Sequence, residues 1–439
     1  MPVTQAKPML NMLLIADSDS QLLACEALCN APTELKVQWS INVIPRDGTP
    51  RALLRRLEQR ASLRHHGLTQ LLRDRRLRDF DAIGVFLTGS KINDIRLALQ
   101  RDRHPPLLFC GFNGVVLDHF IEGVSWRLGY DLICLSGPRD QQALTQLVAG
   151  TPFEQQRTIL TGLRRNAPRP DLVPLGQRPR RLVFAEQVIM PASATERSRL
   201  VRLLSDLALR SPNWEVVIKP RISPGDATFH DVDTHISTTL QRTLGVIPSN
   251  LRLDYRPLPE LLKQARLLAT LSSTAFFDAL DFGCGVIAIS DLGLQPNYGG
   301  HIFAGSGVWQ SLEGIKSLDD LKAKNTSPDP RWLEWMGYGQ QFNSSALFEV
   351  LHAEKNKPRT TLTATIGYPG NDQSSFSQLR LGAEAAIASG DWTSARELLC
   401  QASLMRPLHR GVSRRYWAVR LHNPVLRQLA LLISYRDLK

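Results

Sequence analysis

The sequence predicts an α/β protein with two Rossmann-like, doubly wound parallel-sheet domains, followed by a helical C-terminal extension. Two series of short apolar segments alternate with helix-like segments, one on each side of an Arg/Pro-rich stretch. This alternation is typical of parallel sheets with helical crossovers. The stretch itself has six Arg and four Pro within residues 164–181 and no hydrophobic periodicity, as expected of a linker. The predicted parts are residues 1–163, the linker 164–181, residues 182–330 and the extension 331–439.

The first series contains short apolar segments that end in polar turns, and we expect them to be strands. They cover residues 11–16, 36–45, 81–88, 106–110 and 131–135. Helix-like segments follow the first, third and fifth of these strands and end near residues 29, 99 and 148. Residues 51–78 hold nine Arg and are predicted to form one long helical segment.

The second series repeats the alternation. Strands are expected at residues 181–185, 214–218 and 251–255, helices at 194–209 and 259–267, and a loop with a helix over roughly 226–243. Residues 268–290 then combine an apolar strand, a hydroxyl-rich turn, a helix, a glycine stop and a second apolar strand. In the extension we expect a helix from residue 331 and a helix pair at 378–389 and 392–405, whose spacing resembles one tetratricopeptide unit.

Composition limits the partners and the compartment. The net charge of +12 suits anionic partners, such as nucleotides, nucleic acid, acidic glycans or an anionic membrane surface. The six cysteines form no CxxC pair, which favours free thiols in a reducing compartment. The N-terminus has no signal-peptide pattern, and no segment approaches the roughly 18 apolar residues of a membrane span. We therefore expect a cytoplasmic protein, with a peripheral position at the inner membrane left open.

The hydroxyl-rich turn is the most informative local feature. Ser272, Ser273 and Thr274 follow an apolar strand and precede a helix, with Gly283 beyond it. Free N–H groups and the helix dipole favour an anion at a helix N-terminus. The carboxyl end of a parallel strand is also where α/β sheets bind ligands. The turn therefore predicts a phosphate site, although Ser and Thr are equally ordinary helix caps.

Two cations lie at another strand end. Lys219 and Arg221 are separated by a proline, and both could meet a donor phosphate, unless they form a solvated basic loop. His230 follows on a loop that could reach the same cleft. It also stands near Asp231, Asp233 and His235, but no third rigidly spaced ligand is present, so no metal site is expected.

An acidic turn follows the first strand. Asp17 or Asp19, flanked by Ser18 and Ser20, could act as a general base, or simply cap the next helix.

A second acidic and basic cluster in the first domain, His119 and Glu122, could bind an acceptor or lie on a helix surface. The Arg-rich segments 51–78 and 406–436 could contact anionic lipid or nucleic acid, or be solvated helix faces.

Several of these motifs occur together in an order that resembles a known family. The set consists of residues 16–20, 184–187, 217–221, 271–283, 290–293 and 303–307. It looks like an uncharacterised family of proposed bacterial glycosyltransferases, similar in layout to bacterial sialyltransferases and capsule-type transferases. The resemblance covers about residues 10–310 and implies the GT-B fold, in which two Rossmann-like domains face a cleft.

The resemblance also implies roles for individual residues. In the sialyltransferases a His-Pro step and a serine pair hold a cytidine monophosphate donor, and an acidic loop supplies the base. By resemblance, the step Lys219 to Arg221 stands at the His-Pro position, and Ser272 and Ser273 match the serine pair. Fixed cations replace the histidine, and the usual acidic-acidic-glycine loop is missing, so Asp17 or Asp19 takes its place. A CMP-sugar is therefore only weakly favoured as the donor.

Together these observations predict a metal-independent, inverting glycosyltransferase with no cofactor besides a nucleotide-sugar co-substrate. The expected acceptor is a surface glycan or a lipopolysaccharide-type glycolipid, and nucleic acid is not the expected partner. One alternative is a polyol- or glycerophosphate transferase of the teichoic-acid type. Another is a non-catalytic protein that binds a nucleotide sugar or nucleic acid.

Overall fold

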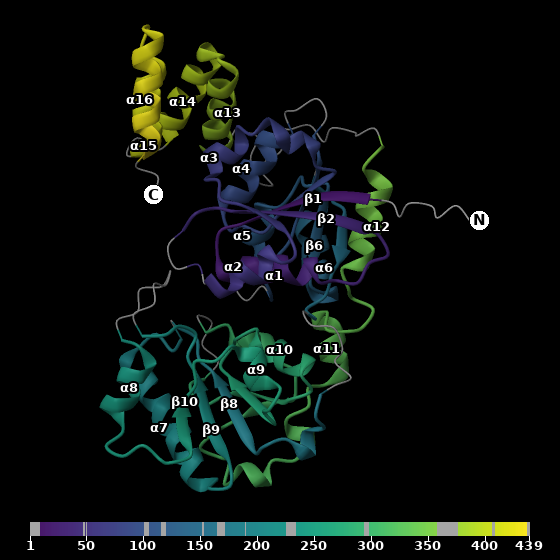
Figure 1. The fold of residues 1–439 in the computed structure, drawn as a ribbon, viewed down its shortest axis with the longest axis vertical. Helices are drawn as coiled ribbons and strands as arrows, with labels where there is room; N and C mark the ends of the chain where they lie inside the picture. Colours follow the sequence, from purple (N-terminus) through teal and green to yellow (C-terminus); the bar gives the residue numbers. More distant parts are fainter. Residues whose placement is uncertain are drawn as a thin grey trace, which may run out of the picture.

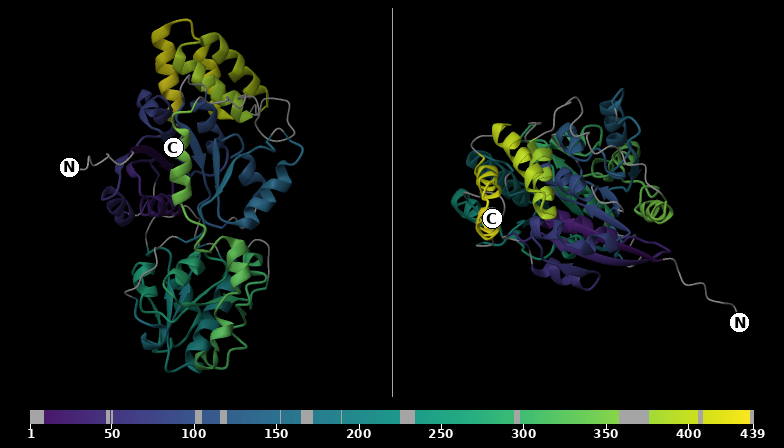
Figure 2. Two further views of the ribbon diagram at one scale, coloured as in Figure 1. Left: turned by 90° about the vertical axis from the view of Figure 1, so that its right-hand side faces the viewer. Right: turned by 90° about the horizontal axis from the view of Figure 1, so that it is seen from above.

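The computed structural model describes residues 9–46, 49, 51–100, 105–115, 120–151, 153–164, 172–188, 190–224, 234–293, 298–357, 376–405 and 409–436. Two α/β domains follow one another along the long axis of the molecule, and a cluster of C-terminal helices sits at the end of the first domain that is remote from the second (Figure 1). The turned view in Figure 2 shows the same order.

The first domain is built on a seven-stranded parallel sheet in the order β3-β2-β1-β4-β5-β6-β7. Its strands are β1 (Met9–Ala16), β2 (Lys36–Val43), β3 (Ser62–Arg64), β4 (Ala82–Val85), β5 (Leu107–Cys110), β6 (Leu132–Leu135) and β7 (Thr158–Leu160). Its helices are α1 (Asp19–Cys29), α2 (Arg51–Glu58), α3 (Leu68–Leu72), α4 (Ser90–Leu99), α5 (Phe120–Ser125) and α6 (Pro138–Val148), with a 3₁₀ turn, η1 (Arg75–Asp79).

Strand β1 lies inside this sheet, between β2 and the central strand β4, because its apolar residues can be buried on both faces. Met12 and Leu14 point into one core, with α1 and α2. Leu13 and Ile15 point into the other, with α3 to α6. The carboxyl end of β1 is thereby fixed near the middle of the sheet edge.

The second domain is built on a six-stranded parallel sheet in the order β10-β9-β8-β11-β12-β13. Its strands are β8 (Arg181–Ala185), β9 (Glu215–Lys219), β10 (Leu251–Leu253), β11 (Leu267–Thr270), β12 (Gly285–Ile289) and β13 (Trp309–Gln310). Helices α7 (Ala194–Arg210) and α8 (Ile236–Thr243) cover one face, and α9 (Leu258–Leu262), α10 (Ala275–Asp281) and α11 (Pro330–Met336) cover the other. The remaining 3₁₀ turns are η2 (Leu175–Gln177), η4 (Gly300–Phe303), η5 (Leu318–Asp320) and η6 (Ala323–Asn325).

After α11 the chain returns to the first domain. Helix α12 (Ser345–Glu354) packs on the first sheet, where Leu347, Phe348 and Leu351 are buried beside β1. The sequence grouped residues 331–439 into one helical extension, but α11 and α12 pack on the second and first domain, respectively. The separate cluster consists of α13 (Phe376–Ser389), α14 (Trp392–Met405), α15 (Arg410–Val419) and α16 (Pro424–Arg436), which share their own core.

The predicted fold class is confirmed: the molecule has two parallel-sheet α/β domains and C-terminal helices. The predicted long helix over residues 51–78 is wrong, because this segment forms α2, β3, α3 and η1. The predictions also omitted β7, β13 and α12. No helix in the described part of the chain is long and apolar enough to cross a membrane.

Candidate functional site

Both sheets reverse their winding direction at one point, and polar turns follow the strands there. The reversal lies between β1 and β4 in the first sheet, and between β8 and β11 in the second. Open α/β sheets bind ligands outside the carboxyl ends of the strands at such points. The predicted acidic turn follows β1, the predicted cations lie at the carboxyl end of β9, and the hydroxyl-rich turn follows β11. Since β8 lies between β9 and β11, the predicted donor residues lie at the two strand ends that flank β8.

Asp17, immediately after β1, is buried and held between cations. Its carboxylate accepts a 2.7 Å hydrogen bond from Lys91 Nζ, and its other oxygen lies 3.7 Å from Arg46. Its backbone N–H donates to the side-chain oxygen of Gln21. With 1% of its surface exposed, Asp17 is positioned to organise the turn rather than to meet a substrate.

Asp19, two residues further on, faces the second domain. Its Oδ2 accepts a 2.7 Å hydrogen bond from Arg221, although the two residues are 202 positions apart. Ser18 occupies the N-cap of α1, so neither predicted carboxylate is the helix cap. The Ser18 and Ser20 hydroxyls lie 3.4 Å apart beside Asp19. The predicted base and one of the predicted donor cations therefore meet across the two domains.

The strand end that carries Arg221 also holds Lys219 in a partly buried position. Burial lowers the pKa of Lys219, and the nearby carboxylates of Glu186 and Asp254 oppose this shift. The Lys219 ammonium donates to the carbonyl oxygen of Pro220, and the backbone N–H of Arg221 donates to Glu186 at 3.0 Å. Glu186 therefore fixes the backbone from which both cations project.

The hydroxyl-rich turn is already hydrogen-bonded within the protein. Gln187, which follows β8, accepts from the Ser272 N–H at 3.0 Å and donates to the Ser272 hydroxyl at 3.1 Å. The Ser273 N–H donates to Thr270, and the Ser273 hydroxyl accepts from the Ala275 N–H. The expectation of several free backbone amides at this turn is therefore wrong.

Thr274 is the open member of the turn. Among the residues that the structure describes, neither its N–H nor its hydroxyl has a hydrogen-bond partner, and it is half-buried at the N-cap of α10. Because α10 has seven residues, its dipole is a small contribution. An anion at this turn would depend on Thr274, on the Ser273 hydroxyl and on the neighbouring cations.

Other predicted site residues do not join this cluster. Glu122 is exposed on α5. Gly283, with φ of +66°, ends α10 at the amino-terminal side of β12, which is the opposite edge of the sheet from the Ser272 turn. His119 and His230 lie outside the described residues, as do Asp231 and Asp233. His235 caps α8 and bonds Ser237 and the Ile222 carbonyl oxygen. In the described part of the chain, no group of three His, Cys, Asp or Glu side chains could hold a metal ion.

Three residues near the site were not predicted to belong to it: Glu186, Gln187 and Lys91. Glu186 and Gln187 directly follow β8, the strand at the reversal point of the second sheet, and Lys91 lies on the helix after β4 at the reversal point of the first. The rule that polar residues at these strand ends face the ligand could have found them.

A groove of about 700 Å³ lies in the first domain between α1 and the segment that leads into α12. Its floor includes Phe86, Gly111 and Leu135 at the ends of β4, β5 and β6. Arg60 and Arg164 are its charged lining residues, and the described lining contains no carboxylate. The groove begins one strand away from β1, since β4 pairs with β1.

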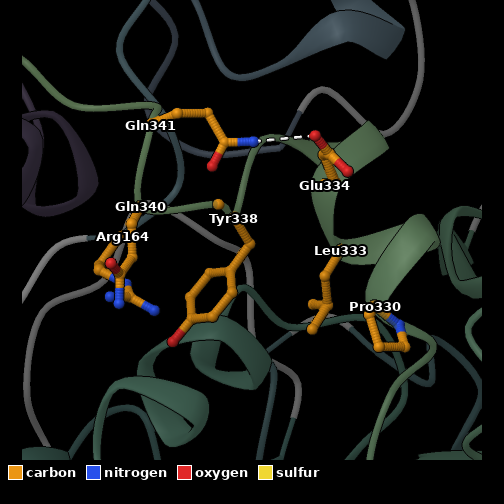
Figure 3. Close-up of a pocket in the computed structure, with 8 residues that line it drawn as sticks. Arg164, Pro330, Leu333, Glu334, Tyr338, Gln340 and Gln341 are labelled. Carbon is orange, nitrogen blue, oxygen red and sulfur yellow. Dashed lines mark hydrogen bonds between the residues drawn. The ribbon is translucent and has the colours of Figure 1, made fainter.

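A smaller cavity, of about 370 Å³, lies where the chain crosses between the domains (Figure 3). Arg164 stands 4.9 Å from the ring of Tyr338, and the Tyr338 hydroxyl donates to Asp281 of α10 at 2.8 Å. The Leu163 N–H donates to the Gly337 carbonyl oxygen, which ties the two crossing segments together. These contacts hold together the two segments that cross between the domains, and we call this pocket the hinge cavity.

Comparisons with known proteins agree with this architecture. Residues 12–353 match the family described as "Putative glycosyltransferase (DUF6716)". A "putative UDP-N-acetylglucosamine 2-epimerase from Listeria monocytogenes" is similar in structure, with a TM-score of 0.54 and 12% identity, over 82% of this chain and 100% of that one. The S. aureus MnaA–UDP co-structure has a TM-score of 0.51 and 14% identity, over 79% of this chain and 96% of that one.

At such low sequence identity, the two structures are evidence for the fold alone, and they support the GT-B arrangement. The search among curated proteins found no match. The family match is the stronger finding, because it covers well over half of the chain and includes both sheets. It confirms the prediction of a glycosyltransferase at the level of the family, and the chain belongs to the glycosyltransferase family DUF6716.

Proposed function

We propose that the protein transfers a sugar, without a metal ion, from a nucleotide-activated donor to a glycan or glycolipid acceptor. The donor phosphate would bind at the carboxyl ends of β8, β9 and β11, and the acceptor would enter over the first domain. The contact between Arg221 and Asp19 carries this proposal. In it, the proposed phosphate-binding cation, which follows β9 next to β8, lies beside a carboxylate that follows β1 at the reversal point of the first sheet.

In this proposal the transfer inverts the anomeric carbon. Asp19 takes the proton of the acceptor hydroxyl as its oxygen attacks the sugar, and the bond to the nucleotide phosphate breaks on the opposite side. Arg221 and Lys219 stabilise the negative charge that develops on the departing phosphate, and Thr274 donates hydrogen bonds to it. A fixed guanidinium suits this role because it keeps its charge at every physiological pH.

Donor binding would also free the base. In the structure the Asp19 carboxylate is engaged by Arg221, so this oxygen does not face an acceptor hydroxyl. The phosphate of the donor competes for the same guanidinium and can accept hydrogen bonds from it bidentately. Asp19 would then turn from Arg221 towards the acceptor, which couples the presence of donor to the activation of the base.

The acceptor expectation rests on the groove beside β1. Its apolar floor and its two arginines suit a molecule that has an apolar part and an anionic group, as glycolipids of the lipopolysaccharide type do. Of the candidate residues in the first domain, Asp19 lies at the end of β1, next to the strand where the groove begins. A CMP-sugar remains the weakly preferred donor.

The test is a thermal-shift screen of the full chain against CMP, CDP, UDP and GDP. A ligand that binds the folded state alone stabilises it by about 2.7 kcal/mol at a hundred times its dissociation constant. We expect one nucleotide to raise the melting temperature of the wild type and to lose most of this effect in Arg221→Ala. Arg202→Ala, an exposed arginine on α7, is the matched control and should keep the full shift.

Three results would count against the proposal. A nucleotide shift that is unchanged in Arg221→Ala would remove the donor site from this position. A shift without any release of nucleotide from an activated sugar would favour a non-catalytic binding protein. A phosphodiester product, identified by mass spectrometry, would favour the polyol- or glycerophosphate transferase instead of a glycosyl transfer.

A further inference from the structure

The outer helix of the C-terminal cluster exposes a continuous apolar face. Val425, Leu426, Leu429, Leu432 and Ile433 are each between 52% and 65% exposed. Their spacing places them on one side of α16, whereas Leu431 and Ser434 on the other side are buried in the cluster. We call these five residues the α16 apolar face. Trp417 on the preceding helix α15 is also 65% exposed.

The same segment is strongly basic. Residues 398–436 contain seven Arg and neither Asp nor Glu. Arg410 and Arg414 are exposed on α15, and Arg420 is exposed directly after it, with its guanidinium 4.8 Å from the ring of Trp417. An exposed apolar face beside arginines and a tryptophan has the composition of a helix that lies in a membrane interface.

The positive charge of this segment distinguishes between three possible partners of the apolar face: a second copy of the chain, nucleic acid and an anionic lipid surface. In a symmetric contact with a second copy, the same arginines would face one another, and α15 and α16 offer no carboxylate to balance them. Nucleic acid would use the arginines but would leave five aliphatic side chains in water. An anionic lipid surface satisfies both features, because its headgroups pair with arginine and its acyl region takes up aliphatic side chains.

The position of the cluster fits this partner. Helix α13 packs on α4 of the first domain, and the cluster stands at the end of the molecule remote from the second domain (Figure 1). None of its described residues lines the groove or the hinge cavity. Contact through α15 and α16 would therefore leave the groove and the Asp19 turn uncovered. Since no described helix can cross a membrane, the contact would be peripheral.

We propose that α15 and α16 dock the protein onto the surface of an anionic lipid bilayer, with the α16 apolar face inserted and the arginines at headgroup level. This inference goes beyond the proposed transfer reaction and stands on different residues.

The test is flotation of the full chain with vesicles of phosphatidylcholine alone or mixed with phosphatidylglycerol. We expect at least tenfold tighter binding to the mixed vesicles, weakened by salt. The triple variant Leu429→Ser, Leu432→Ser and Ile433→Ser should lose most of this binding, as should Arg410→Gln with Arg420→Gln. Leu209→Ser with Val246→Ser is the matched control, because it removes residues that are 64% and 87% exposed on the second domain, and it should bind like the wild type.

Equal binding to neutral and mixed vesicles, or unchanged binding of the triple variant, would overturn the proposal. So would a dimer that light scattering detects in the wild type and not in the triple variant, or a preference for RNA over vesicles. Because all substituted side chains are exposed, the melting temperature should not change. The nucleotide-induced shift should also persist in every variant, so failure here is distinguishable from failure of the proposed transfer reaction.

Discussion

At the scale of single residues, the contact between Asp19 and Arg221 matters for the proposed mechanism more than for the stability of the fold. Both side chains are partly exposed, and such ion pairs contribute roughly 0–1 kcal/mol. A weak pair is easily exchanged for a phosphate, which is what a donor site requires. The pair formed by Asp17 and Lys91 differs, because Asp17 is buried and its removal would leave Lys91 without that partner.

This contrast predicts different outcomes for the two aspartates. Asp19→Asn should lower kcat by about 10²–10⁴ and leave the melting temperature nearly unchanged, since the amide cannot take a proton. Asp17→Asn should chiefly lower the melting temperature, because the charge that balances Lys91 and Arg46 is lost. Steady-state kinetics and thermal unfolding of both variants measure the difference. The reverse pattern, with activity lost in a fully stable Asp17→Asn, would assign the base to Asp17.

The residue types at the site were predictable, but their hydrogen bonds were not. Asp19 and Arg221 follow strands and Lys219 is the last residue of one, so the expectation that ligands bind at strand ends was enough to select them. The hydrogen bonds between Gln187 and Ser272 join residues 85 positions apart. The local sequence does not indicate such a long-range contact, so it could not be predicted that the backbone N–H groups of the turn are already hydrogen-bonded.

At the scale of elements, the long apolar strands were predictable and the short edge elements were not. The residues of β12 form an unbroken apolar run, and β1 is apolar except for Asn11. In contrast, β3 has three residues within an arginine-rich segment. It forms a strand because it pairs in parallel with β2, with Leu63 opposite Ile41. Tertiary pairing overrides local propensity in such short segments, and the predicted long helix failed for this reason.

Helix α12 was not predicted from the sequence, and its packing on the first sheet can be tested. Phe348 is fully buried on the first sheet and meets Trp39 edge-to-face at 5.7 Å. Phe348→Ala should reduce the stability of the first domain by about 3–5 kcal/mol, because it leaves a cavity. Hydrogen exchange of amides in β1 and β2 measures this loss. The exposed neighbour substitution Glu349→Ala should leave exchange unchanged; equal protection in both variants would mean that α12 does not support the sheet.

At the scale of the whole molecule, the proposed reaction and the proposed membrane contact lie on different parts. The Asp19 turn and the strand ends of the second domain form one region, and α15 and α16 form the other. The first domain joins them through the contact of α13 with α4. At the centre of this contact Asp94, which is fully buried, accepts a hydrogen bond from Arg380.

The pair of Asp94 and Arg380 should make this junction sensitive to pH. Burial raises the pKa of Asp94 from 3.8 to about 6, while Arg380 opposes the shift. The folded state therefore holds a proton that the unfolded state releases between these pH values, so this carboxyl favours folding most at low pH and loses that contribution as pH rises through about 6.

In Arg380→Met the charged form of Asp94 has no partner cation on α13, and breaking a buried pair in this way costs about 3–5 kcal/mol. We therefore expect amides of α13 to lose protection from hydrogen exchange at pH 8 and to keep it at pH 5, after correction for intrinsic rates. Glu397→Gln, an exposed change within the same helical cluster, should behave like the wild type at both pH values. Equal protection of Arg380→Met and the wild type at pH 8 would show that packing alone holds the cluster to the first domain.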